Sequence, residues 1–505
     1  MKPKFLKVVN ESVLVIIYTY MIGPATDPIP FQPGRPATQE AQNPVNVQEE
    51  AKTFVSGGNG SPFKVILSIL LIFVLLGAIG AVVYKFILPK LSKPENVALT
   101  YWGLWEENNI IGPIIEDYQK AHPDVKINYQ RQSPRDYRER LQSAMAREEG
   151  PDIFRFHNTW VPMFKGDLVP IPANVYDPAT YEATFYPVAR NDLRLGNSYI
   201  GIPLEIDGLG LYINTDLFKA AAKQSPKTWD ELRKTALELT VRDSGGKIQI
   251  AGVALGRTEN VDHWSDILAL MMLQNGANLS DPGKCYMPTS SAGEAGETCL
   301  GADALTYFTI FSQIDGVWDK TLPASTLAFS GGKLAMYFGP SWEVFEIKRM
   351  NPNLNFEIVP VPQLPDTNIT FASYWAEGVS KKSKNQEAAW EFLKYLSSRE
   401  VLQKLYQDSS KTRLFGEPYG RVDMASILEN QPYVGAYIKS AFTAQSWYLS
   451  SKTYDNGLND KLITYYANAV NEVNSGKTSK EALVTAGLGV SQILSQYGLA
   501  SSVVR

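Results

Sequence analysis

The chain has 505 residues with 48 Lys or Arg and 52 Asp or Glu, so its formal net charge is −4. No run of basic residues follows one face of an element, and we therefore expect no nucleic acid partner. The three histidines, His122, His157 and His263, are far apart and lack the spacing of zinc ligands, so we expect no metal site and no cofactor. The 26 Tyr and 10 Trp residues favour a surface that binds its ligand with aromatic rings.

The first 63 residues contain little that would build a core. Residues 1–7 are basic and residues 13–22 are apolar, but Asn10 and Glu11 interrupt the pattern and no cleavage site follows. We interpret this stretch as a short apolar element and not as a signal peptide. Seven prolines lie between positions 24 and 62 among many Gln, Asn and Ala residues, which predicts a disordered spacer.

The stretch Val65–Tyr84 contains no charged residue, and Lys64 and Lys85 flank it. As a helix it would be about 30 Å long, roughly the thickness of the hydrocarbon core of a bilayer. A buried core helix is the alternative, but such a helix seldom runs this long without a polar face. We predict a single transmembrane helix over residues 64–88. The flanking lysines slightly favour a cytoplasmic C-terminus, although this rule is weak for a long translocated domain.

From Pro94 onward the pattern becomes α/β, and the region is too long for one core, which predicts two lobes. We expect strands at 97–102, 125–129 and 152–156, with helices at 109–121 and 135–149 between them. Later strands are expected at 209–213, near 250, at 334–338 and at 356–359, with helices starting at 229 and 262 and a mostly helical tail from 433. This alternation predicts a largely parallel sheet, with ligands at the carboxyl ends of its strands.

The two cysteines, Cys285 and Cys299, flank a loop rich in Gly and Ser. A disulfide between them would tie the loop and stabilise the fold by about 3 kcal/mol on the chain-entropy estimate. Two unrelated thiols are the alternative. We favour the disulfide because a loop of this composition would be mobile unless tied, and because an anchored domain meets oxidising conditions if it faces outside the cell.

Several segments, taken in order, resemble one protein family. They are VKINYQ from Val125, YRERLQSAMAREEGPDIFRF from Tyr137, LVPIP from Leu168, YIGIPLEIDGLGLYINTDLF from Tyr199, SPKTWDELRKTALELT from Ser225, LAFSGGKLAMYFGPSWEVF from Leu327 and VSKKSKNQEAAWEFLKYLSS from Val379. Together they make residues 97 to about 500 similar to the extracellular solute-binding proteins of ABC importers, of the sugar-binding, maltodextrin-binding-like type.

The resemblance implies an α/β, two-lobe periplasmic-binding-protein-like (type II) fold with hinge crossings, preceded here by the single transmembrane helix. It implies a first lobe of residues 95–207 and 376–430 and a second lobe of residues 208–375 and 431–505. It also implies that the C-terminal domain lies outside the cell membrane. Most members of the family are held by a lipidated cysteine or are free, and this chain departs from that pattern.

Sugars present hydroxyls around apolar ring faces, so a site for them needs flat aromatic rings and fixed carboxylates or amides. The resemblance places candidate ligand-binding residues in the cleft loops and the crossings: Trp105, Glu106, Asn158, Trp160, Asp207, Trp264, Trp342, Tyr374 and Trp375. Trp342 is the leading candidate, and Arg413 and Trp447 are weaker ones because the family varies there. Structural alternatives stay open: Glu106 would begin a helix, and Asp207 would cap hinge backbone.

Two motifs hint at enzymes. Ser330–Lys333 has the S-x-x-K spacing of a serine acyl-enzyme, but no S-D-N or K-T-G motif accompanies it in the sequence. We interpret it as a glycine turn before a strand. Gly339–Glu343 fails the G-x-S-x-G pattern at its last position.

We therefore predict a membrane-anchored, extracytoplasmic receptor that is not an enzyme. It would capture a mono- or oligosaccharide in an interlobe cleft and deliver it to the permease subunits of an ABC transporter. A sensing or adhesion module with the same fold is one alternative, since the N-terminal head could bind a cytoplasmic protein. A glycan-processing enzyme with paired carboxylates such as Glu106 and Asp207 is another.

Overall fold

The computed structural model describes residues 73, 75–77, 96–286 and 297–499. The chain divides into two units, Met1–Ser92 and Lys93–Arg505. The predicted head lies outside the described residues, and so does most of the predicted spanning segment, of which Phe73 and residues 75–77 are helical. Within the described ranges, no helix combines the length and the apolar character that crossing a membrane requires.

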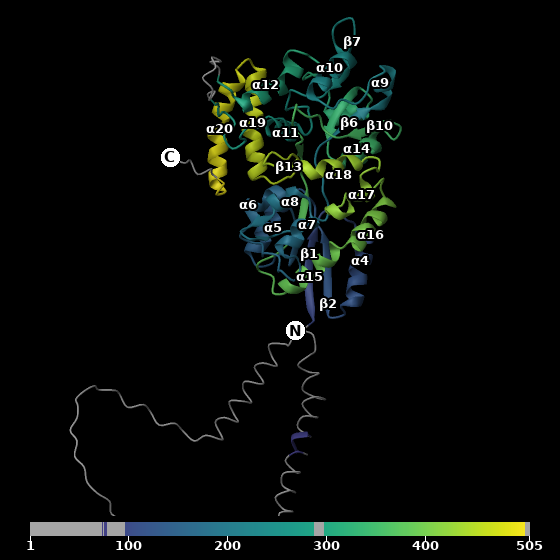
Figure 1. Cartoon of the computed structure of the whole chain (residues 1–505), viewed down its shortest axis with the longest axis vertical. Coiled ribbons are helices and arrows are strands. Elements are labelled where there is room, and N and C mark those ends of the chain that lie inside the picture. The colour runs from purple at the N-terminus through teal and green to yellow at the C-terminus, as the bar shows by residue number, and fades with distance from the viewer. Residues whose placement is uncertain (1–72, 74, 78–95, 287–296, 500–505) are drawn as a thin grey trace, which may run out of the picture. The chain divides into compact units, whose positions relative to one another are not determined.

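The second unit contains two larger sheets, each surrounded by helices (Figure 1), and two sheets of two short strands. The first has the strand order β12-β3-β1-β2. Its strands are β1 (Val97–Gly103), β2 (Val125–Arg131), β3 (Ile153–His157) and β12 (Trp375–Val379). β1 pairs in parallel with β2 and β3, whereas β12 runs antiparallel to β3 and places Trp375 opposite His157. We call this sheet and its helices the first lobe.

Two of the helices of the first lobe, α4 (Asn108–Ala121) and α5 (Tyr137–Ala146), were predicted, and α5 is shorter at both ends than the expected range 135–149. The others are α6 (Val161–Phe164), α7 (Pro178–Thr184), α8 (Pro187–Asp192), α15 (Gln386–Leu396), α16 (Arg399–Ser410) and α17 (Ala425–Leu428). α4 buries Ile110, Ile111, Ile114, Ile115 and Tyr118, which share one helical face. A 3-10 helix, Asn158–Trp160, follows β3, and a short hairpin joins Arg194–Leu195 to Ser198–Tyr199.

The second sheet has the order β10-β6-β9-β8-β7. Its strands are β6 (Gly210–Asn214), β7 (Val241–Arg242), β8 (Ile248–Val253), β9 (Leu334–Gly339) and β10 (Phe356–Val359). Only β8 and β9 pair in parallel, so the prediction of a largely parallel sheet is wrong for this sheet. The reason is the connections: a short hairpin joins β7 to β8, and β6 enters directly from the first lobe without a crossover helix. We call this sheet and its helices the second lobe.

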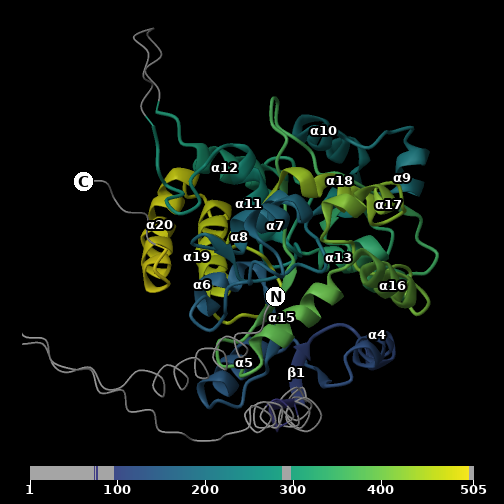
Figure 2. The ribbon, with the colours of Figure 1, turned by 60° about the horizontal axis from the view of Figure 1, so that its bottom comes forward.

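The second lobe is covered by helices on both faces (Figures 1 and 2). They are α9 (Thr215–Ala220), α10 (Trp229–Leu239), α11 (Trp264–Gln274), α12 (Leu300–Gln313), α13 (Ser325–Ser330), α14 (Glu343–Met350), α18 (Gly435–Ser440), α19 (Leu458–Asn474) and α20 (Ser479–Gln496). A capping box of Thr228 and Glu231 begins α10. α11 begins two residues later than expected, because the Asp262 carboxylate bonds Thr326 and His263 has a left-handed φ of 58°.

The two lobes are joined where crossing segments touch. β11 (Thr370–Phe371) pairs in parallel with β13 (Ala444–Gln445), and Gly208 bridges Ala372 beside them. A Cβ on Gly208 would lie 1.9 Å from the carbonyl oxygen of Phe371. Only glycine therefore allows the first crossing to pass this close to the return crossing.

Away from the crossings, Cys285 and Cys299 form a disulfide, the pairing that the loop composition favours. Next to the bridge, the backbones of Tyr286 and Thr298 exchange hydrogen bonds of 2.8 and 2.9 Å. The bridge and this pair hold the two ends of the loop together.

Candidate functional site

A cavity of about 360 Å³ lies where the crossings and both lobes meet, a size in the range of small-molecule sites. Its aromatic and charged lining consists of Trp105, Trp342, Phe345, Trp375, Tyr454, Glu205, Asp207, Asp266, Glu346, Glu417, Arg413, Lys452, His157 and His263. Among the predicted ligand contacts, the structure brings four to this cavity: Trp105, Asp207, Trp342 and Trp375.

Aromatic rings reach the cavity from both lobes. Trp105 follows β1 and is 36% exposed, and its ring meets that of Trp375 edge to face at 5.9 Å. Trp342 precedes α14 in the second lobe and is 39% exposed. Rings that remain this exposed leave faces available for the apolar side of a ligand.

Asp207 connects the first crossing to the segment before α14. Its carboxylate accepts bonds from Ser341 N at 3.0 and 3.1 Å, from Ser341 Oγ at 2.8 Å and from Gly208 N at 2.8 Å. Burial raises the pKa of Asp207 to about 7 in spite of these donors. The side chain therefore fixes the backbone beside Trp342 and also borders the cavity.

Glu205 precedes Asp207 by two residues in the same crossing. Its Oε1 accepts a bond of 2.8 Å from Trp375 N, which ties the first crossing to β12. Burial raises the pKa of Glu205 well above its usual value, and the charges of Glu417 and Asp207 raise it further.

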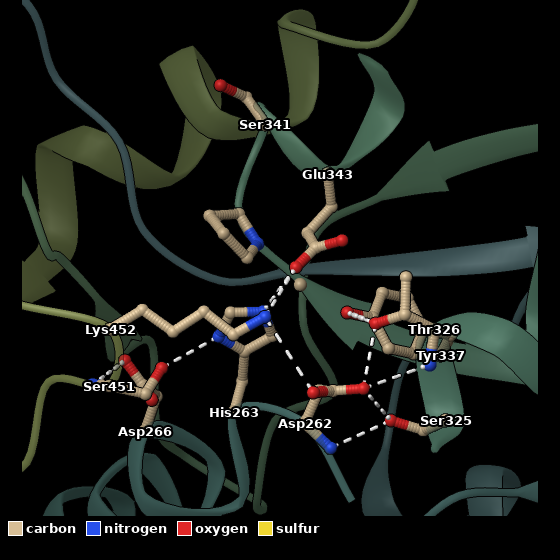
Figure 3. Close-up of polar contacts among 12 residues, drawn as sticks. Asp262, His263, Asp266, Ser325, Thr326, Tyr337, Ser341, Glu343, Ser451 and Lys452 are labelled. Atoms are coloured by element: carbon tan, nitrogen blue, oxygen red, sulfur yellow. Dashed lines mark hydrogen bonds and ion pairs between the residues drawn. The ribbon is translucent and has the colours of Figure 1, made fainter. Parts of the chain in front are cut away.

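A polar network in the second lobe joins His263, Glu343 and Lys452 (Figure 3). His263 Nε2 lies 2.9 Å from Glu343 Oε1, and His263 Nδ1 lies 2.7 Å from Ser451 Oγ. Lys452 Nζ donates to Glu343 Oε1 at 3.2 Å and lies 5.3 Å from the centre of the Trp342 ring. The His263 ring meets Trp342 edge to face at 5.7 Å, so two anchored side chains hold this ring in place.

Glu343 is the centre of this network and is 1% exposed. Burial alone would raise its pKa, but the hydrogen bond and charge of His263, together with Lys452, lower it below its usual range. The ionised carboxylate in turn raises the pKa of Lys452 against the effect of burial. The network is therefore an ion pair that belongs to the wall of the cavity.

Glu106, a predicted ligand contact, does not line the cavity. Both of its oxygens accept bonds from Arg155 Nη1, at 3.0 and 2.9 Å, and Arg155 Nε donates to Glu377 at 2.6 Å. The guanidinium of Arg155 is buried in β3 and needs such counter-ions, so the Glu106 carboxylate is engaged with Arg155. Glu106 and Asp207 thus do not form the catalytic carboxylate pair that the enzyme alternative needs.

Four other predicted contacts also lie away from the cavity. Asn158 donates to Asp192 at 2.8 Å and accepts from Tyr374 N, while the hydroxyl of the fully buried Tyr374 donates to Asp192 at 3.0 Å. Trp160 is fully buried and stacks on Phe164. Trp264 begins α11 and packs against the core. These residues build the walls behind the cavity, because the polar groups of Asn158 and Tyr374 are bonded within the fold and the rings of Trp160 and Trp264 pack in the core or against it.

For several residues that line the cavity, the sequence offered no indication of this position. His157 lines the cavity between Thr159 Oγ1 at 2.8 Å and Ser373 Oγ at 3.0 Å, and burial lowers its pKa to about 3. Lys452 and Tyr454 lie in a loop, and both have left-handed φ values. Neither position is a glycine, the residue type that would indicate this conformation in a sequence. Arg413, a weaker candidate, lines the cavity, whereas Trp447 does not.

Comparison with known proteins identifies a family that matches this chain. The family model described as bacterial extracellular solute-binding protein matches residues 105–403, more than half of the chain. The multiple sugar-binding protein of Streptococcus mutans is 24% identical over 397 residues, which cover 74% of this chain and 91% of that protein.

Solved structures share the fold. The cyclic alpha-maltosyl-1,6-maltose binding protein from Arthrobacter globiformis gives a TM-score of 0.62 at 18% identity, over 79% of this chain and 99% of that one. A cyclo/maltodextrin-binding protein complexed with maltotetraose gives 0.61 at 17% identity, over 80% and 98%. The α/β fold is thus periplasmic-binding-protein-like, as expected. The chain belongs to the bacterial extracellular solute-binding protein family, whose members bind solutes and are not enzymes.

Proposed function

We propose that this protein is an extracytoplasmic receptor that captures a carbohydrate in the cavity and delivers it to the permease of an ABC transporter. One observation carries the proposal: three tryptophan rings and fixed carboxyl groups from both lobes converge on one cavity. Ring faces would cover the C–H faces of a sugar, and the carboxyl groups would bond its hydroxyls. The similarity to proteins named for binding sugars supports the same ligand class.

The lobes would act by closure around this ligand. Residues 95–207 and 376–430 would move against residues 208–375 and 431–505, with hinges at the crossings beside Gly208. A ligand that contacts Trp105 in one lobe and Trp342 in the other is bound fully only when the lobes are closed. It would therefore shift the population toward the closed state.

We further propose that residues 64–88 tether the receptor to the membrane with the C-terminal domain outside. The uncharged 20-residue stretch Val65–Tyr84 supports this proposal. Alkaline phosphatase fused after Arg505 should be active when the fusion is produced in a host with an oxidising exterior. A cytoplasmic, inactive fusion would reverse the orientation.

A ligand screen tests the receptor proposal. The purified full-length chain would be heated with mono- and oligosaccharides, amino acids and short peptides, and the unfolding temperature recorded. The proposal predicts a rise for one class of carbohydrate and no rise for the other solutes. A rise for peptides or amino acids alone would contradict it, and so would turnover of a glycan by the pure protein.

A further inference from the structure

The cavity contains more acidic groups than cations to pair with them. Its carboxyl groups are Glu205, Asp207, Asp266, Glu346 and Glu417, and its permanent cations are Arg413 and Lys452. Each cation already has a carboxylate partner, because Arg413 pairs with Glu417 at 2.6 Å and Lys452 with Glu343 at 3.2 Å. Among the described residues, neither Glu205 nor Asp207 forms an ion pair.

Among the described residues, Glu205 is the buried acidic group of this cavity that keeps one carboxylate oxygen unbonded. It is 8% exposed and lines the cavity, and only its Oε1 is bonded, to Trp375 N. Within the described part of the chain its Oε2 has no hydrogen-bond partner. The charged groups around Glu205 are Glu417 and Asp207, which disfavour its ionised form, and Arg155 and Arg413, which favour it.

We propose that the ligand of this cavity is a saccharide that carries a protonated amine, which Glu205 binds beside Asp207 and the tryptophan rings. This inference rests on the proposed function and names the ligand class of the same site. An ammonium group would supply the positive charge that these buried carboxyl groups lack. The faces of Trp105, Trp342 and Trp375 would also attract a cation through their ring quadrupoles.

Proton release is a separate consequence of this mode of binding. In the empty cavity, burial favours the neutral form of Glu205 and holds the pKa of Asp207 at about 7. An arriving ammonium group favours the ionised carboxylates, so protons leave the protein on binding. A neutral sugar hydroxyl has no such effect on these groups.

Matched ligands test the inference on the full-length chain by titration calorimetry at neutral pH. Cellobiose, N,N′-diacetylchitobiose and the glucosamine dimer share one framework and differ at the same carbon of each of their two rings, which carries a hydroxyl, an acetamide or an ammonium group. Glucose with glucosamine and galactose with galactosamine extend the series to monosaccharides. We expect at least one amine to bind about tenfold more tightly than its neutral counterparts, with heats that vary with the ionisation enthalpy of the buffer.

Glu205→Gln keeps the shape of the side chain and removes its charge, so it should abolish most of the preference for the amine. Glu116→Gln on the exposed face of α4 is the matched control and should keep the preference. The inference is overturned if no amine in the wild-type series binds more tightly than its neutral partner. If neutral saccharides bind but no amine binds more tightly, the proposed receptor function stands and only this inference fails. If no saccharide binds in the wider screen, the inference and the proposed function both fail.

Discussion

Replacing Trp342 with Ala should weaken ligand binding without unfolding the protein. The side chain is 39% exposed, which for a tryptophan of about 250 Å² leaves roughly 100 Å² uncovered. A sugar ring that covers half of this area would gain about 1.2 kcal/mol at ~25 cal/mol per Å², so Trp342→Ala should raise Kd about sevenfold. The saccharide that gives the largest rise in unfolding temperature is the ligand to titrate.

The matched control is Phe442→Ala. Phe442 is 44% exposed and packs on Tyr186 away from the cavity, so its loss removes a comparable exposed ring. We expect an unchanged Kd for this variant. The reasoning is refuted if Trp342→Ala binds as tightly as the wild type, or if Phe442→Ala weakens binding to the same degree.

Three further outcomes follow from contacts outside the aromatic rings. Gly208→Ala should lower the unfolding temperature by several degrees, because the added Cβ would lie 1.9 Å from the Phe371 carbonyl oxygen. An unfolding temperature equal to that of the wild type would contradict this and would show that the crossings adjust freely. Reducing the bond between Cys285 and Cys299 should cost about 3 kcal/mol of unfolding free energy in urea and leave Kd unchanged, since neither residue lines the cavity; an altered Kd would contradict this. Burial raises the pKa of the Asp207 carboxyl to about 7 in the folded protein, whereas its ordinary pKa in the unfolded chain is 3.8. Its contribution to stability therefore falls as pH rises through this window. Asp207→Asn should make the urea midpoint less sensitive to pH between these values, and an equally steep profile in the variant would disprove the assignment.

Much of the first lobe could be predicted from the sequence because its signals are local. The spacing of Ile110, Ile111, Ile114, Ile115 and Tyr118 predicts α4, and alternating helices predict parallel neighbours for β1. The direction of strands in the second sheet was not predictable in this way. β6 and β9 are buried at every position, and a fully apolar run gives no sign of which neighbour it pairs with or in which direction.

The candidate site was partly predictable for a similar reason. Trp105 and Trp342 lie beside elements that the sequence marks well, and both line the cavity. The sequence could not indicate that Glu106 pairs with Arg155, because it does not show that this arginine is buried and needs two counter-ions. Glu417 and Lys452 reach the cavity only through tertiary folding, so their positions along the chain carry no local signal.

The central claim is that both lobes hold a carbohydrate in the cavity that Trp105, Trp342 and Trp375 line. A crystal structure of the protein with the saccharide selected by the ligand screen tests this most directly. We predict electron density for the sugar between the rings of the two lobes, with Glu205 and Asp207 within hydrogen-bonding distance of its polar groups. A sugar bound outside this cavity, or in contact with one lobe only in the closed state, would contradict the claim.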